Sequence, residues 1–244
     1  AAAAAAKTPE EKFRVQLANE SYQQFELFMK LRRDLADGRY ESLGSDTAQW
    51  RKRHAELVAK YKAQVCFPIY GGSYFDAFYK LTYEDASRIA ASYKFVTPPM
   101  RVWKIQADKE KQGEAQGFAK PEFADAKWKK ADTNMDSWSA LGYHDYFGSM
   151  WYRSQVQIPA APAGKKTFLW ISSTDGKVKV FVNGQHVPYV NAKGEKSAEF
   201  EGYCQPISLD ISSAIKPGGE NQISLLCTRT FFNELGTGGL LSQT

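Results

Sequence analysis

The stretch GSMWYRSQVQIP, Gly148–Pro159, marks the change to strand-like sequence, because a small aromatic and basic cluster leads into the alternating run SQVQIP and the run ends at a proline. Alternation of polar and apolar residues is typical of a half-buried strand. On either side of it we expect further strands in VWKIQAD (102–108), KKTFLWISST (165–174), GKVKVFVNG (176–184) and QISLLCTRT (222–230). Several short strands with turns and no helices between them indicate an antiparallel β-sandwich.

Turn-forming residues separate these predicted strands. Asn183-Gly184 predicts a type I′ turn that joins two strands, since both of its residues tolerate positive φ. The sequence TDG at 174–176 predicts a hairpin between the runs on either side of it. Asp210 is placed to cap a short turn at 212–215. These residues are expected to build the fold rather than bind a ligand.

The strand that begins with Trp-Tyr-Arg poses a packing question. Trp151 and Tyr152 point to opposite faces of a strand, so at most one of them can enter the sandwich core. Arg153 returns to the face of Trp151, and an arginine so close to a core needs a carboxylate or backbone carbonyls. We favour that structural role over a ligand contact.

The front of the chain has a helical period. From Pro9 to about Gly38 apolar residues recur at helical spacing, and the run ends at a glycine suited to a C-cap, so we expect one long amphipathic helix. A second helix is expected over 45–65, capped by Ser45 or Asp46. His54 then lies beside core positions, and a packed histidine is favoured over a catalytic one.

A third helix is expected over 81–96, where Thr82 and Asp85 resemble a capping box. Before it, Gly71-Gly72 suggests a break among aromatic residues, which are expected to pack under the helices. The prolines of TPPM, 97–100, disfavour further helix.

The change of period gives the domain organisation. We expect a helical region over 1–96 and a β-sandwich over 97–244, and thus an α+β fold. The six alanines at 1–6 are left out of this reasoning.

Composition excludes several classes of protein. The hydrophobic share of 43% and the charged share of 24% are typical of folded globular domains. The net charge of +5 is spread along the chain, so no nucleic-acid partner is indicated. No apolar run approaches the ~20 residues of a membrane span, and no signal-peptide pattern is visible.

The three cysteines, Cys66, Cys204 and Cys227, do not have the spacing of a zinc site. A disulfide between Cys204 and Cys227 remains open, and the favoured alternative is that both are small buried side chains.

Four motifs occur in a recognisable order: PEFADAKW (121–128), GSMWYR (148–153), VKVFVNGQHV (178–187) and LDIS followed by IKPGGENQIS (209–224). Together they resemble the jelly-roll, galactose-binding-like, sugar-binding domain of family 2 glycoside hydrolases, the group of β-galactosidases and β-glucuronidases. The resemblance spans Val102 to Leu241, more than half of the chain.

The resemblance implies a function without catalysis in this chain. In the family the catalytic carboxylates come from a separate (β/α) barrel, and a barrel of about 250 residues does not fit beside the sandwich. We therefore expect a non-catalytic carbohydrate-binding or domain-bracing module, the C-terminal part of a larger glycoside hydrolase acting on polysaccharide or glycoside. Its partners would be carbohydrate and an upstream catalytic domain or partner chain, and its location extracellular, periplasmic or at the cell surface. No cofactor is expected; a structural calcium remains open, because such sites use scattered carbonyls.

Two segments carry candidate ligand-binding residues. Exposed aromatics can stack on sugars, and neighbouring polar groups can bind hydroxyls. In WSALGYHDYFG the candidates are Trp138, Tyr143, His144, Asp145 and Tyr146, although this loop could equally cover the end of the sandwich. In RTFFNELGTGGLL, which the resemblance matches to a family loop that can approach the barrel, they are Arg229, Asn233 and Glu234, and a plain loop-tip role is equally open. No catalytic residue is assigned.

Two other functions compete. An architectural protein of a surface or extracellular assembly would be favoured by an exposed apolar stripe on the first helix. A small stand-alone hydrolase would need a nucleophile and a base, yet the sequence has no G-x-S-x-G elbow and only three histidines, none with an obvious partner.

Overall fold

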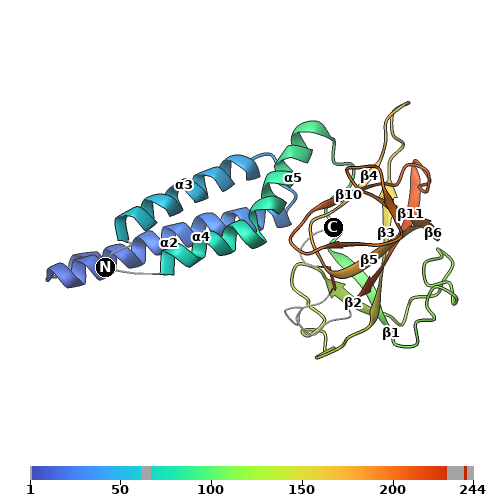
Figure 1. The fold of residues 1–244 in the computed structure, drawn as a ribbon, viewed down its shortest axis with the longest axis horizontal. Coiled ribbons are helices and arrows are strands. Elements are labelled where there is room, and N and C mark those ends of the chain that lie inside the picture. The colour runs from blue at the N-terminus through green and yellow to red at the C-terminus, as the bar shows by residue number, and fades with distance from the viewer. Residues whose placement is uncertain (1, 62–66, 230–238, 241–244) are drawn as a thin grey trace. The chain divides into compact units, whose positions relative to one another are not determined.

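The computed structural model describes residues 2–61, 67–229 and 239–240. The chain divides into two compact units, Ala1–Tyr93 and Lys94–Thr244, and each is described by itself. The first unit is helical, with the elements α1 (Ala2–Ala5), α2 (Pro9–Ala36), α3 (Leu43–Tyr61), α4 (Phe67–Phe78) and α5 (Lys80–Ser92). Within it, α2, α3 and α4 run side by side (Figure 1).

The long helix α2 begins at a complete capping box. The Thr8 hydroxyl accepts a hydrogen bond from the Glu11 amide at 3.2 Å, and the Glu11 carboxylate accepts one from the Thr8 amide at 3.0 Å. Pro9 follows at the first helical position, where its missing N–H costs nothing. The helix ends before Gly38, which adopts the left-handed φ of 73°. The single long helix predicted from the sequence is confirmed.

The predicted caps of the other two helices are wrong. The helix α3 begins at Leu43, because the Asp46 amide already donates to the Ser42 carbonyl at 2.9 Å, and this places Ser45 and Asp46 inside the helix. In α5 the N-cap is Tyr79, without a side-chain cap. Thr82 is buried inside that helix and therefore faces the core instead of the helix end.

Aromatic rings hold the helices together. Trp50 of α3 lies between Phe75 of α4, 3.9 Å between ring centroids, and His54, at 5.0 Å. His54 is thus a packed histidine, as predicted. The predicted break at Gly71-Gly72 does not occur, since α4 runs through it. A Cβ at Gly72 would come within 2.5 Å of His54 Nε2, so the glycine permits close packing of the two helices.

The second unit is an antiparallel β-sandwich, which confirms the predicted α+β fold. Its strands are β1 (Val102–Asp108), β2 (Lys129–Asp132), β3 (Ser149–Ile158), β4 (Phe168–Ile171), β5 (Thr174–Val182), β6 (Gln185–Val187), β7 (Tyr189–Val190), β8 (Lys196–Ser197), β9 (Phe200–Gly202), β10 (Ile207–Asp210), β11 (Gly219–Thr228) and β12 (Gly239–Leu240). The large sheet has the order β12-β5-β11-β3-β1-β2, with β6 and β9 also paired to β5. The strands β4 and β10 form a second, two-stranded sheet, and β7 and β8 pair separately.

One hydrophobic core lies between the large sheet and the β4–β10 sheet. Trp103, Tyr152 and Leu225 of the large sheet belong to the same buried cluster as Ile171 and Leu209 of the smaller one. All five side chains are at most 2% exposed. Packing of two inner faces on a shared core is the arrangement that defines a sandwich.

Two predicted turns are confirmed. Asn183 and Gly184 have φ of 51° and 81°, and they join β5 to β6, which pair from Val182 and Gln185 onward. Asp210 accepts a hydrogen bond from the Ser212 amide at 3.1 Å and caps the turn that follows β10.

The hairpin predicted at Thr174–Gly176 is wrong. These residues lie inside β5, and β4 pairs with β10 in the other sheet instead of with β5. Gly176 has a φ of 104°, and a Cβ on it would lie 2.6 Å from the Thr228 carbonyl oxygen of the neighbouring strand. The glycine therefore serves a close approach of two strands beside a register shift.

Candidate functional site

The face of the large sheet that turns away from the main core is also covered. Trp151 and Tyr152 are both buried, at 0% and 2% exposed, although they point to opposite faces of β3. Tyr152 belongs to the main core, as the prediction of a single core position required, and Trp151 belongs to a second cluster with Phe181 and Leu226. The segment 109–128 covers this second cluster through Phe118 and neighbouring residues.

Arg153 fastens this covering segment to the sheet. Its side chain is 1% exposed, and its Nε donates to Asp125 Oδ2 at 2.8 Å. Its remaining N–H groups donate to the carbonyls of Phe118 and Lys120, the latter at 3.0 Å, and to Gln222 Oε1 at 3.2 Å. The predicted structural role of Arg153, with a carboxylate and backbone carbonyls as partners, is confirmed.

Asp125 is held in its charged form by two cations. Burial tends to raise the pKa of this carboxyl, but hydrogen bonds from Arg153 and Lys104 outweigh it and bring the pKa below its usual value. Lys104 Nζ lies 2.6 Å from Asp125 Oδ1. A charged carboxylate with both oxygens occupied is suited to a structural role.

A second carboxylate of this unit, Asp108, accepts hydrogen bonds from neutral donors instead of cations. Asp108 is 8% exposed, and its Oδ2 accepts from the indole Nε1 of Trp151 at 3.0 Å and from the Gly113 amide at 2.9 Å. Its Oδ1 accepts from the Gln112 amide at 2.9 Å. Sequence reasoning singled out neither this role of Asp108 nor that of Asp125, although PEFADAKW, which contains Asp125, carried part of the family resemblance.

The structure corrects the prediction that Trp138 is an exposed platform for a sugar. Trp138 is 0% exposed within the main core, and its Nε1 donates to the Tyr152 hydroxyl at 2.6 Å. Both the apolar ring and its single donor are used by the fold, because a large aromatic gains most from full burial when its N–H finds a partner.

The other candidates of this loop differ in accessibility. Tyr143 and Tyr146 are half-buried and pack against the core, and the Tyr146 hydroxyl donates to the Ser149 carbonyl at 2.9 Å. His144 and Asp145 are exposed, and Asp145 has a left-handed φ of 53°. The five candidates therefore do not form one surface; the accessible part is centred on His144 and Asp145.

Arg229 joins the two candidate segments. It is 2% exposed, and its guanidinium carbon lies 5.8 Å from the ring centre of Trp138 and 5.1 Å from that of Phe147. Its amide donates to the Gly148 carbonyl at 3.0 Å. The structure thus brings the end of β11 against the loop 137–148, while Asn233 and Glu234 lie outside the described residues.

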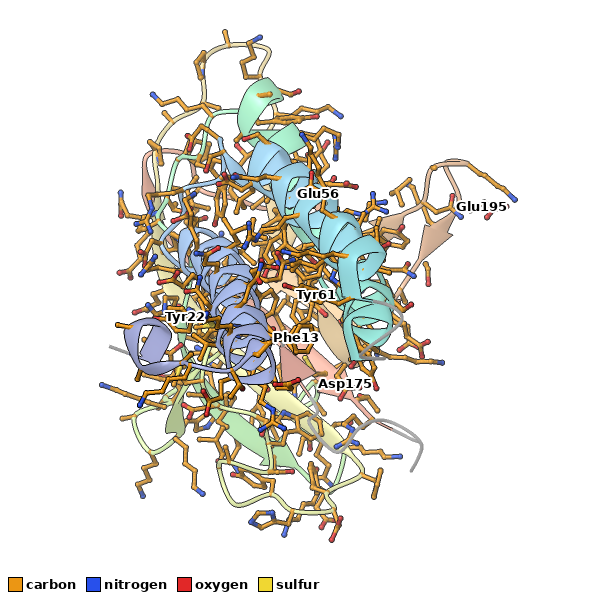
Figure 2. All side chains as sticks on the ribbon, turned by 90° about the vertical axis from the view of Figure 1, so that its left-hand side faces the viewer. Phe13, Tyr22, Glu56, Tyr61, Asp175 and Glu195 are labelled. Carbon is orange, nitrogen blue, oxygen red and sulfur yellow. The ribbon has the colours of Figure 1, made fainter. Side chains whose placement is uncertain are left out.

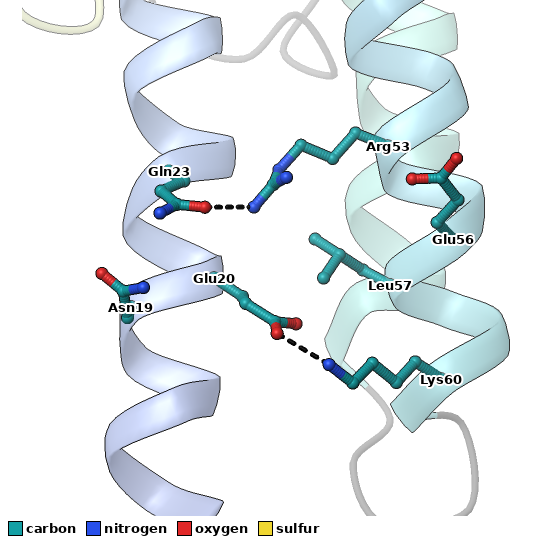
Figure 3. Close-up of a pocket in the computed structure, with 7 residues that line it drawn as sticks. All are labelled: Asn19, Glu20, Gln23, Arg53, Glu56, Leu57 and Lys60. Atoms are coloured by element: carbon teal, nitrogen blue, oxygen red, sulfur yellow. Dashed lines mark hydrogen bonds and ion pairs between the residues drawn. The ribbon is translucent and has the colours of Figure 1, made fainter. Parts of the chain in front are cut away.

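The helical unit has a polar groove between α2 and α3, with a volume of about 320 Å³ (Figure 3). Ion and hydrogen-bond pairs cross it: Lys60 lies 2.7 Å from Glu20, and Arg53 donates to Gln23 at 2.6 Å. Burial opposes the charged form of Glu20, yet the hydrogen bond from Lys60 keeps its pKa below the usual value. These pairs join the two helices and leave the groove without a convergent set of charges.

The described parts of the chain contain neither a metal-ligand cluster nor a membrane-spanning helix. No group of three or more His, Cys, Asp and Glu side chains there is placed to hold a metal ion. None of the helices there combines the length and apolar character needed to cross a bilayer. Cys204 is a half-buried free thiol and Cys227 a buried one, so the disulfide between them that the sequence allowed is not formed. Cys66 lies outside the described residues.

The known proteins similar to this chain include β-glucuronidases. No family model matches the chain. A β-glucuronidase of Paenibacillus borealis is 24% identical over 126 residues, which cover 51% of this chain and 20% of that protein. The β-sandwich is related to β-glucuronidases of glycoside hydrolase family 2. The chain spans about one fifth of the length of the curated relative that it matches.

Solved structures similar to this chain include two of Ruminococcus gnavus β-glucuronidase. One is 26% identical, covers 54% of this chain and 20% of that chain, and has a TM-score of 0.45. The other, in complex with D-glucaro-d-lactam, is 22% identical, covers 58% and 27%, and has a TM-score of 0.47.

Proposed function

We propose that this chain is a non-catalytic, domain-bracing module of a glycoside hydrolase, and that the catalytic carboxylates are supplied by another domain or a partner chain. Retaining glycoside hydrolysis needs two carboxyl groups about 5 Å apart that are free to act on the sugar. The observation that carries the proposal is that Asp108 and Asp125 are both occupied by hydrogen bonds internal to the fold.

The packing of the sandwich supports a bracing role. One face is held by the buried Arg153, and at the end of β11 Arg229 packs on the rings of Trp138 and Phe147. These two buried arginines, each with several internal partners, make the sandwich rigid, and a rigid domain binds a neighbouring domain at a low entropic cost. The substrate class of the assembled enzyme would be a glycoside or polysaccharide, with β-glucuronides as the first compounds to try, because the matched relative is named a β-glucuronidase. Its location would be extracellular, periplasmic or at the cell surface.

The experiment isolates the polypeptide from its natural source and determines its intact mass and its tightly associated chains. We expect a barrel-sized catalytic domain, in the same polypeptide or in a co-purifying one, and hydrolysis of 4-nitrophenyl β-D-glucuronide or a related aryl glycoside by that whole assembly. The 244-residue chain alone is expected to release no 4-nitrophenol. Hydrolysis by the chain alone, or a source protein of 27.4 kDa without a catalytic partner, would contradict the proposal.

Carbohydrate contact by the loop 137–148 is a second candidate function. The observation that favours it is that His144 and Asp145 are exposed beside the half-buried Tyr143, and that Asp145 keeps a left-handed backbone. Lys129 Nζ lies 4.9 Å from the ring centre of Tyr143 and adds a donor close to this ring. Such a set of groups could hydrogen-bond a sugar at the end of the sandwich.

A glycan array followed by titration calorimetry tests this second function. His144→Ala and Asp145→Gly are the informative variants, since glycine keeps the left-handed φ of position 145. We expect both variants to lower the affinity at least about tenfold, and Tyr74→Ala, a change on the helical unit at a side chain that is 63% exposed, to leave it unchanged. Absence of glycan binding by the unaltered chain would exclude this function and leave the bracing role standing.

A further inference from the structure

The helix α2 has two faces of different character. One face packs inside the helical unit and carries the buried residues Gln24, Leu31, Asp34 and Leu35. The other face exposes three large apolar side chains: Tyr22 is 59% exposed, Phe25 54% and Met29 42%. Figure 2 shows Tyr22 on the side of α2 away from α3, whereas Phe13 points toward Tyr61 between the helices.

The residues on this face, of which Val15 and Ala36 are half-buried, follow a regular period. Val15, Ala18, Tyr22, Phe25 and Met29 are separated by three, four, three and four residues, and the same spacing continues to Arg32 and Ala36. This is the 3.5-residue period of a seam along which a second helix packs. Scattered exposed apolar residues are common, but apolar residues that keep this spacing over two heptads, from Val15 to Met29, indicate a helical partner. We call residues 15, 18, 22, 25, 29, 32 and 36 the outer seam.

We propose that the outer seam packs against the outer seam of a second copy of this chain, with the two helices antiparallel. In that arrangement residues whose numbers add up to 47 face each other from Val15 to Arg32, and Ala36 lies opposite Glu11. Tyr22 then meets Phe25 of the second copy, and the small Ala18 meets Met29. Two large side chains thus meet only at the pair of Tyr22 and Phe25. In the layers on either side a large side chain, Met29, meets a small one, Ala18, so the surface is complementary to itself.

Charge favours the antiparallel direction. The first turn of α2 is acidic, with Glu10 and Glu11, and its last turn contains Arg33, next to Arg32 of the outer seam. Antiparallel pairing brings Arg32, which also lies over the Phe28 and Tyr79 rings of its own copy, within one helical turn of the capping carboxylate of Glu11 of the other copy. Parallel pairing would place Arg32 beside Arg32 and Glu11 beside Glu11, which is unfavourable at both ends.

The oligomeric state in solution tests the proposal. Light scattering coupled to size exclusion, over about 5–200 μM chain, is expected to show a dimer. Phe25→Glu buries a charge at the centre of the seam and should shift the chain to monomer, with an increase in the dimer dissociation constant of at least about a hundredfold. The matched control is Leu81→Glu in α5, which introduces the same charge at another exposed apolar residue, 48% exposed, and should leave the dimer intact.

Each contrary result overturns the proposal. A monomer at the highest concentration, or a dimer that Phe25→Glu does not weaken, would show that the outer seam does not join two copies. A monomer whose melting temperature falls in Phe25→Glu but not in Leu81→Glu would show that the seam is covered within one chain. Circular dichroism of both variants confirms that the helices are retained.

Disulfide trapping tests the direction of the pair. The double variant Ala18→Cys with Met29→Cys should form a covalent dimer under mild oxidation, since residues 18 and 29 face each other in an antiparallel pair. Ala18→Cys alone should remain at the level of the unaltered chain, which corrects for its three native cysteines. Efficient cross-linking of Ala18→Cys alone would indicate a parallel pair and overturn the antiparallel arrangement.

Discussion

The guanidinium of Arg153 lies 2.8 Å from the carboxylate of Asp125, and this ion pair, with the arginine side chain 1% exposed, joins β3 to the segment that covers the outer face of the sheet. A buried pair of this kind contributes little against an apolar pair of the same shape, but losing one partner leaves an uncompensated charge.

Asp125→Ala should therefore lower the free energy of unfolding by about 3–5 kcal/mol, because Arg153 stays buried without its carboxylate. Urea unfolding followed by tryptophan fluorescence measures the change. Lys177→Ala, which breaks the exposed pair with Glu199, is the control and should shift the midpoint far less. Equal losses in the two variants would contradict a special role for the buried pair.

Acid should weaken the sandwich through the same carboxylate. The pKa of Asp125 is lowered in the folded state, because hydrogen bonds from Arg153 and Lys104 outweigh the effect of burial. A lowered pKa contributes stability that is present above the unfolded value of about 3.9 and is lost as the pH falls through the folded value. Unfolding free energies measured from about pH 6 to pH 2 should thus fall less steeply in Asp125→Asn than in the unaltered chain. Parallel curves would indicate that Asp125 does not carry this dependence.

Gly176→Ala should destabilise the sandwich strongly. The added Cβ would lie 2.6 Å from the Thr228 carbonyl oxygen, and the φ of 104° is itself unfavourable for alanine, so a loss of about 3 kcal/mol or more is expected. Gly164→Ala is the matched control: its φ is 76° but no atom lies within 4 Å of the added Cβ, and a loss of about 1 kcal/mol is expected. A difference of less than about 1 kcal/mol in thermal or urea unfolding would show that the strands can separate to accept the methyl group.

Tyr152→Phe should cost about 1–3 kcal/mol, since the indole N–H of the fully buried Trp138 loses its acceptor at 2.6 Å. Tyr143→Phe removes the same atom from a half-buried tyrosine of the loop 137–148 and is expected to cost less. Urea unfolding of the two variants provides the comparison. A Tyr152→Phe variant as stable as the unaltered chain would mean that the indole finds another acceptor.

Local patterns were sufficient where local physics decides the structure. The long helix α2, the strand run Val102–Asp108 and the turn at Asn183-Gly184 depend on periodicity and on residues that tolerate positive φ, and each was predicted correctly. The role of Arg153 could also be inferred, because a buried guanidinium allows few alternatives.

The errors fall where distant residues decide. Thr174–Gly176 has the composition of a hairpin turn, but β4 pairs with β10, more than thirty residues later, and the glycine is needed for the approach of β11. The caps at Ser45 and Thr82 failed for the same reason, since burial of Leu43 and Thr82 in the helical unit overrides the cap preference. The sequence allowed Trp138 either a surface or a core position, and only its full burial and its hydrogen bond to the Tyr152 hydroxyl of β3 show which.

The α+β class, the order of helices and strands, and the family resemblance can be read from the sequence, because they depend on short-range periodicity and on motifs along the chain. Which polar groups are used up by the fold, and which remain accessible, is visible only in the folded structure. Hydrogen bonds such as those of Asp108, Asp125 and Trp138, and the exposure of Tyr22, Phe25 and Met29, depend on which strands and helices meet. Burial and satisfaction of polar groups are properties of contacts between distant residues, and no local pattern contains them.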